Sequence, residues 1–70
     1  MSTAVTKVTE AEQVALSSML QAEVVAVRQI QAILPMVADQ EMRQEIEACI
    51  QTGKTHISAL LSFSKEHHLI

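Results

Sequence analysis

The stretch from Leu16 to Leu34 constrains the fold of this chain more than any other part of it. On a helix of about 100° per residue, most of its large apolar side chains fall within about 60° of one line. Glu23 lies at the centre of that line. The stretch therefore predicts an amphipathic helix whose packing stripe carries a carboxylate. The apolar members of this stripe are Leu16, Met19, Leu20, Val27, Ile30 and Leu34.

The ends of this first helix have recognisable signals. Thr9 and Glu12 have the spacing of a capping box, so the helix is expected to begin near Glu10. Pro35 disfavours helical geometry at Leu34 and predicts the end of the helix, or a kink, at that point.

A second helix is expected a few residues later. Asp39 can cap it, and it would run from about residue 40 to residue 66. Because a short connection joins two long helices, an antiparallel hairpin is predicted. Gly53 lies on the packing stripe, where a glycine indicates close approach of another helix or of a large side chain. The stripe consists of Met42, Ile46, Ile50, Gly53, Ile57, Leu60 and Ser64.

The domain organisation follows from these signals. We expect a polar N-terminal tail at residues 1–9, a helical hairpin at 10–66 and a short C-terminal tail at 67–70. Within the hairpin, the helices are expected at about 10–34 and 40–66.

A chain of 70 residues buries too little surface to be stable easily on its own. The single cysteine, Cys49, excludes an intrachain disulfide, so a partner chain or a metal has to supply the missing stability. Apolar residues such as Val14, Val25 and Ile33 also lie outside the stripe of the first helix, where one facing helix does not reach them. We therefore expect a two-fold dimer of hairpins that forms a four-helix bundle, although a larger helical assembly satisfies the same reasoning. The residues expected to form the core or the dimer contact are Leu16, Met19, Leu20, Val27, Ile30, Leu34, Ile46, Ile50, Gly53, Ile57 and Leu60.

The charge pattern limits the classes of partner. Five basic residues against eight acidic ones give a net charge of −3, and the basic residues are not clustered, so no nucleic-acid partner is expected. The polar residues within 14–34 would make membrane insertion costly. The start of the chain has no apolar segment typical of a secretion signal. These features predict an intracellular protein with a reduced Cys49.

Glu23 offers the clearest chemical clue. A carboxylate among apolar side chains has to be hydrogen-bonded, lie at a hydrated seam, become protonated or bind a cation. His56 follows 33 residues later, a separation that can place both side chains in one layer of a hairpin. A glutamate hydrogen-bonded to a neighbouring helix is the first interpretation. The alternative is a metal site for Fe or Zn made by Glu23 and His56 from two chains. Cys49 could add a thiolate only if it points inward, and it is expected to be a small buried apolar residue.

Together these features resemble half of a ferritin-like bundle. They are Glu23 in the middle of the first helix, the segment Asp39-Gln40-Glu41-Met42-Arg43 at the start of the second, and His56 midway along it. Within that superfamily the chain is most similar to the small spore-coat proteins of endospore-forming bacteria. The resemblance implies a ferritin-like four-helix bundle in which Glu23 takes one ligand position of a di-iron site. The second helix departs from the pattern because it has no Glu-x-x-His motif, and Gly53 stands three residues before His56.

The function expected from this sequence is non-enzymatic. The chain has no nucleophile and base in a recognisable pattern, no phosphate-binding loop and no complete metal motif. We expect a structural or protein-interaction module, a homodimer that resembles a spore-coat component and is cytoplasmic or spore-associated, with no resident cofactor. One alternative is a metal-binding bundle with the reduced Glu23 and His56 site. Another is a helical-hairpin regulator or a phosphotransfer protein that uses His56.

Overall fold

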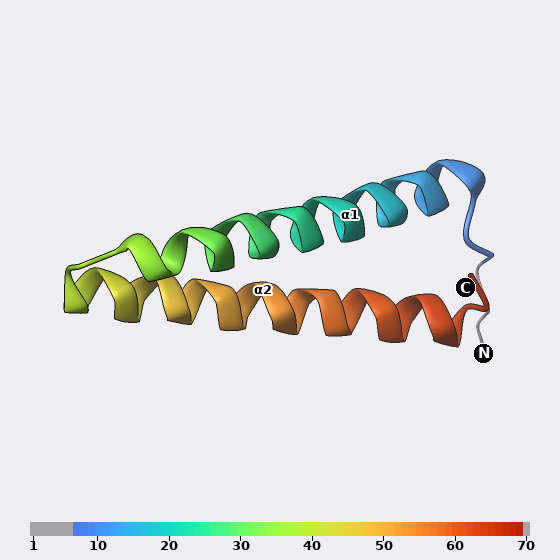
Figure 1. The fold of residues 1–70 in the computed structure, drawn as a ribbon. Coiled ribbons are helices and arrows are strands. Elements are labelled where there is room, and N and C mark those ends of the chain that lie inside the picture. The colour runs from blue at the N-terminus through green and yellow to red at the C-terminus, as the bar shows by residue number, and fades with distance from the viewer. Residues whose placement is uncertain (1–6, 70) are drawn as a thin grey trace.

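The computed structural model describes residues 7–69, which form two long antiparallel helices (Figure 1). Helix α1 spans Glu10–Ile33, a single 3₁₀ turn η1 spans Leu34–Met36, and helix α2 spans Gln40–Glu66. No strand occurs between residues 7 and 69. The predicted all-α hairpin is therefore confirmed. The first six residues of the predicted N-terminal tail and the last residue of the C-terminal tail lie outside the described residues.

Helix α1 begins with the expected capping box. The amide of Glu12 donates to Thr9 Oγ1 at 3.1 Å, and the amide of Thr9 donates to Glu12 Oε1 at 2.9 Å. Two backbone N–H groups that the helix itself leaves without partners are thereby satisfied. The start of α1 is thus fixed by local chemistry.

The capping box makes the stability of α1 depend on pH. The hydrogen bond from the Thr9 amide, together with the Thr9 hydroxyl, holds the pKa of Glu12 below its ordinary value of 4.5. A carboxyl group whose pKa is lowered by folding stabilises the folded state above its unfolded pKa, and this contribution is lost as the pH falls through the folded pKa. We expect wild type to lose more stability than Glu12→Gln between pH 6 and pH 3, because glutamine retains a capping side chain but does not titrate. Thermal unfolding followed by circular dichroism measures this, and parallel pH profiles would contradict it.

Side-chain hydrogen bonds hold the connection between the helices. Arg43 Nη1 donates to the carbonyl oxygens of Leu34 at 3.0 Å and of Val37 at 3.1 Å. The amide of Met42 donates to Asp39 Oδ1 at 2.7 Å, which confirms Asp39 as the cap of α2. These contacts satisfy backbone groups at both helix ends and fix the reversal of the chain at Pro35.

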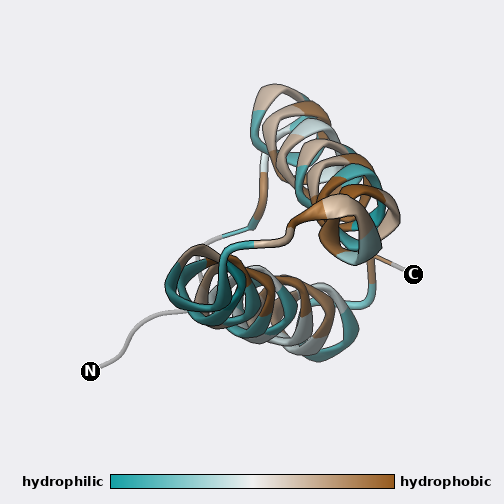
Figure 2. Cartoon of the chain, turned by 60° about the vertical axis from the view of Figure 1, so that its left-hand side comes forward, coloured by the Kyte–Doolittle hydropathy of each residue, from teal (hydrophilic) through white to brown (hydrophobic). Residues whose placement is uncertain are grey.

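The two helices pack most closely around Gly53. A Cβ atom at this position would lie 2.6 Å from Val27 Cγ2, which is too close for any larger residue without displacement of Val27. Within residues 7–69, Val27 and Ile50 are the only buried apolar side chains, and they are 7% and 6% exposed. The expected close approach at Gly53 is therefore confirmed. Figure 2 shows hydrophobic colour on the side of α2 that faces α1 and hydrophilic colour on its outer side.

The helices diverge from the connection toward the open end of the hairpin (Figure 1). Most of the expected packing residues are only half-buried at both ends of the hairpin, and Met19 is 51% exposed. Its side chain lies at the edge of the α1 stripe and is left uncovered in the single hairpin. Its place in a dimer contact therefore stays a prediction. The half-buried packing residues are Leu16, Leu20, Ile30, Leu34, Ile46, Ile57 and Leu60.

Neither of the two described helices combines the length and apolarity that crossing a membrane requires.

Candidate functional site

The close approach at Gly53 brings Glu23 and His56 together. Glu23 Oε1 of α1 lies 3.5 Å from His56 Nδ1 of α2. A Cβ atom on Gly53 would lie 3.6 Å from Glu23 Oε2, so the carboxylate lies directly beside Gly53. The predicted placement of both residues in one layer of the hairpin is therefore confirmed.

The pair is accessible to solvent in the single hairpin. The side chain of Glu23 is 35% exposed and that of His56 is 58% exposed. Glu23 therefore lies at a hydrated seam beside a histidine, which is one of the situations expected for it. The contact becomes an ion pair when the imidazole is protonated, and water screens much of its energy at this exposure.

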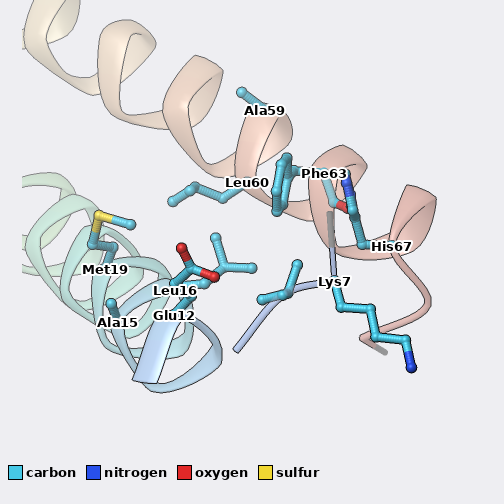
Figure 3. A pocket seen from close by; sticks show the side chains of 10 residues that line it. Lys7, Glu12, Ala15, Leu16, Met19, Ala59, Leu60, Phe63 and His67 are labelled. Carbon is cyan, nitrogen blue, oxygen red and sulfur yellow. The ribbon is translucent and has the colours of Figure 1, made fainter. Parts of the chain in front are cut away.

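Three adjoining hollows make a groove along one face of the hairpin, and the pair lies in its middle. The hollow at the open end has a volume of about 660 Å³ and contains Leu16, Met19, Leu60 and Phe63 (Figure 3). The middle hollow is lined by residues including Glu23 and His56. The third, toward the connection, has a volume of about 350 Å³. We call this surface the groove face and define it by Ala15, Met19, Ala22, Cys49, His56, Ala59 and Phe63.

The groove face runs beside the packing stripe of each helix. Its residues recur in alternating four- and three-residue steps, which is the spacing of any one face of a helix. Sequence reasoning missed this face because alanines and polar residues make up much of it, and the spacing alone does not distinguish it. The residues at this spacing are Ala15, Met19, Ala22, Ala26, Gln29 and Ile33 on α1, and Glu45, Cys49, Thr52, His56, Ala59 and Phe63 on α2.

The hollows on the opposite flank of the hairpin combine polar and apolar side chains. Their lining includes Gln13, Ser17, Gln31, Glu47 and Gln51 beside Leu16, Leu20, Leu34, Ile50 and Leu69. The groove face differs from this flank in the exposed side chains of Met19 and Phe63.

Phe63 dominates the open end of the groove. The chain has one phenylalanine and neither tryptophan nor tyrosine, and the side chain of this phenylalanine is 42% exposed. The ring stacks on His67 with centroids 4.0 Å apart, and His67 Nδ1 lies 2.9 Å from the carbonyl oxygen of Phe63 (Figure 3). This stacking holds an apolar surface in an orientation open to solvent.

Cys49 is exposed, which corrects the expectation of a small buried residue. It lies on the flank of α2 that α1 does not cover, and it lines the same hollow as Glu23, Gly53 and His56. The thiol therefore belongs to the groove face.

One chain brings together few metal ligands. Within residues 7–69, no group of three or more histidine, cysteine, aspartate or glutamate side chains is arranged to hold a metal ion. Glu23 and His56 are two donors, and a protein site for Zn usually has at least three. A complete site at this position would need donors from a second chain.

Comparison of this chain with protein-family models, curated proteins and solved structures finds no significant match. The likeness of Glu23, His56 and the segment 39–43 to ferritin-like spore-coat proteins therefore remains a prediction from the sequence.

Proposed function

We propose that this chain works as a homodimer that forms a ferritin-like four-helix bundle. The bundle serves inside the cell as a non-enzymatic structural or protein-interaction module, comparable to a spore-coat component. The observation that supports this proposal is the groove face. Met19 and Phe63 are 51% and 42% exposed there, while within residues 7–69 the single hairpin buries only the apolar side chains of Val27 and Ile50. A surface of this kind on so small a chain favours association over an independent monomer.

The hydrophobic effect supplies the driving force. Each Å² of apolar surface removed from water contributes about 25 cal/mol. The half-buried side chains around Leu16, Leu60 and Met19 gain further cover when another hairpin lies over the groove. Outside the groove face, Val14 and Val25 of α1 remain 67% and 52% exposed, so such a bundle still presents apolar side chains to other molecules, which suits a building block.

Cys49 provides a direct test of this proposal. Its thiol is exposed in one hairpin and would be covered in the dimer. We expect alkylation of Cys49 by iodoacetamide to be slow at high protein concentration and to accelerate at least tenfold on dilution below the dissociation constant. A rate that is the same at all concentrations would overturn the proposal.

A matched control separates dimerisation from general reactivity. Ser58 is exposed on the outer side of α2, so Ser58→Cys in a Cys49→Ala background places a thiol away from the groove face. Its alkylation rate is expected to be independent of protein concentration. Slowing of both thiols alike at high concentration would indicate aggregation instead of the proposed dimer.

A second candidate function is supported by the 3.5 Å contact between Glu23 Oε1 and His56 Nδ1. Two chains together would supply two carboxylates and two imidazoles, a donor set suited to Zn or Fe.

We expect such a bundle to bind one or two metal ions per dimer and to lose them in Glu23→Gln. Native mass spectrometry after addition of zinc measures this directly, with Glu45→Gln as the control carboxylate nearer the connection. Equal zinc binding by both variants would contradict this second function and leave the structural one in place.

A further inference from the structure

The groove face differs in shape along its length. The hollow at the open end has a volume of about 660 Å³, and the one toward the connection about 350 Å³. Helices α1 and α2 are also further apart at the open end (Figure 1). The open end can therefore receive a narrow partner, whereas two open ends placed against each other would leave a large unfilled space, which is unfavourable in a packed interface.

The charged residues also differ between the two ends of the groove face. Lys7, Glu12 and His67 line the open end, and Glu45 lines the hollow toward the connection. Glu12 remains a carboxylate, because the hydrogen bond that it accepts from the Thr9 amide lowers its pKa. The open end therefore carries a cation, an anion and a histidine, whereas the hollow toward the connection is lined, among the described residues, by carboxylates and by no lysine or arginine. Glu23 and His56 lie between them.

The size of the face matches what a stable dimer needs. The chain has extents of 53 × 22 × 15 Å, and the 24 residues of α1 give a helical length of about 36 Å. A face of about 36 by 22 Å covers roughly 800 Å², which is the area that each partner contributes to a standard protein interface. A second copy of the same hairpin fits these dimensions.

Two face-to-face arrangements of a two-fold dimer exist. In one, the two connections lie at the same end of the bundle, which sets wide end against wide end and brings the two Glu45 side chains to one level. In the other, the connections lie at opposite ends. Each Glu45 then lies near Lys7, Glu12 and His67 of the second copy, and each wide end receives a narrow one. The second arrangement keeps the two Glu45 side chains apart and leaves less unfilled space, so we favour it.

We propose that the groove face binds the groove face of a second copy of this chain, with the two connections at opposite ends of the bundle. In this arrangement the Glu23 and His56 pair of one copy meets the same pair of the other copy at the two-fold axis. This inference rests on the proposed dimer and adds its interface and its orientation. Glu23 and His56 lie midway along the helices, so a two-fold axis through the middle of the face brings the pairs of both copies into one layer. The partner thereby doubles the set of ionisable groups at the centre of the groove.

A distance measurement between spin labels tests the orientation. Ala38 is exposed in the connection, so Ala38→Cys in a Cys49→Ala background carries a nitroxide at one end of each hairpin. Ala38 lies 16 residues before Lys54, and Lys54 is near the level of the central pair. At a rise of about 1.5 Å per residue, each label is therefore about 24 Å from the two-fold axis along the bundle. The two labels are then about 50 Å apart when the connections lie at opposite ends. With the connections at the same end, the labels would be less than about 25 Å apart, since neighbouring helix axes are about 10 Å apart. Double electron–electron resonance distinguishes these values.

A label at Ser58 serves as the control for association. This position lies close to the middle of α2, so its labels are expected within about 30 Å of each other in either arrangement. A short Ser58 distance together with an Ala38 distance near 50 Å supports the proposal. A short Ser58 distance with a short Ala38 distance overturns the orientation but leaves the dimer standing. The absence of any dipolar signal at both positions overturns the proposed dimer itself.

Discussion

Gly53→Leu is expected to lower the free energy of unfolding by about 2 kcal/mol or more, which is a large share of the stability of so small a domain. A Cβ atom alone would lie 2.6 Å from Val27 Cγ2, and Val27 is 7% exposed. Valine is stiff about its first side-chain torsion, so it cannot move aside without shifting the helix. Overpacking therefore outweighs the gain of about 1 kcal/mol that replacement of a helical glycine brings elsewhere. Urea unfolding followed by circular dichroism gives the difference.

Thr55→Leu is the matched control for this substitution. Thr55 is exposed two residues further along α2, on the side away from α1, so leucine meets no neighbouring helix there. Its effect is expected to stay within about 0.5 kcal/mol. If Gly53→Leu stabilised the protein, the close packing of α1 on α2 at this point would be wrong.

Ala22→Glu is expected to raise the dissociation constant of the dimer at least 100-fold, which corresponds to about 3 kcal/mol. Ala22 lines the middle hollow of the groove face, beside Glu23. A carboxylate introduced there would be buried in the dimer close to two carboxylates that are already present, at a high desolvation cost and with repulsion. In the single hairpin Ala22 is exposed, so the monomer should remain helical. Sedimentation velocity over a range of concentrations measures the change.

Ala32→Glu provides the comparison on the same helix. Ala32 is exposed and lies on the opposite side of α1 from the packing stripe, so the new carboxylate stays in water in either state. We expect its dissociation constant to remain within about threefold of wild type, which is less than 1 kcal/mol. Equal weakening by both substitutions would show that the groove face is not the interface.

Local signals allowed much of the hairpin to be predicted from the sequence. The capping box at Thr9, the cap at Asp39 and the break at Pro35 each act within a few residues, and the structure confirms all three. The contact between Glu23 and His56 was predictable because a short connection fixes which residues of the two helices share a layer. Gly53 indicated in the same way where the helices approach most closely.

The exposure of Met19 and Cys49 could not be predicted from the same signals. Helical periodicity gives the direction of a side chain, but it does not say how far around that side chain the second helix reaches. Met19 lies at the edge of the α1 stripe and is 51% exposed, whereas Leu16, nearer the open end, is half-buried. Cys49 lies on a flank of α2 that α1 does not cover. The groove face could not be predicted because the alanines and polar residues that make up much of it do not mark a packing surface.

The mass of the native particle tests the proposed bundle most directly. One chain has a mass of 7.7 kDa. Sedimentation equilibrium of the untagged protein at micromolar to millimolar concentration is expected to give twice that mass, with dissociation on dilution. A particle with the mass of one chain over the whole range would contradict the four-helix bundle, and with it the proposed role of the groove face.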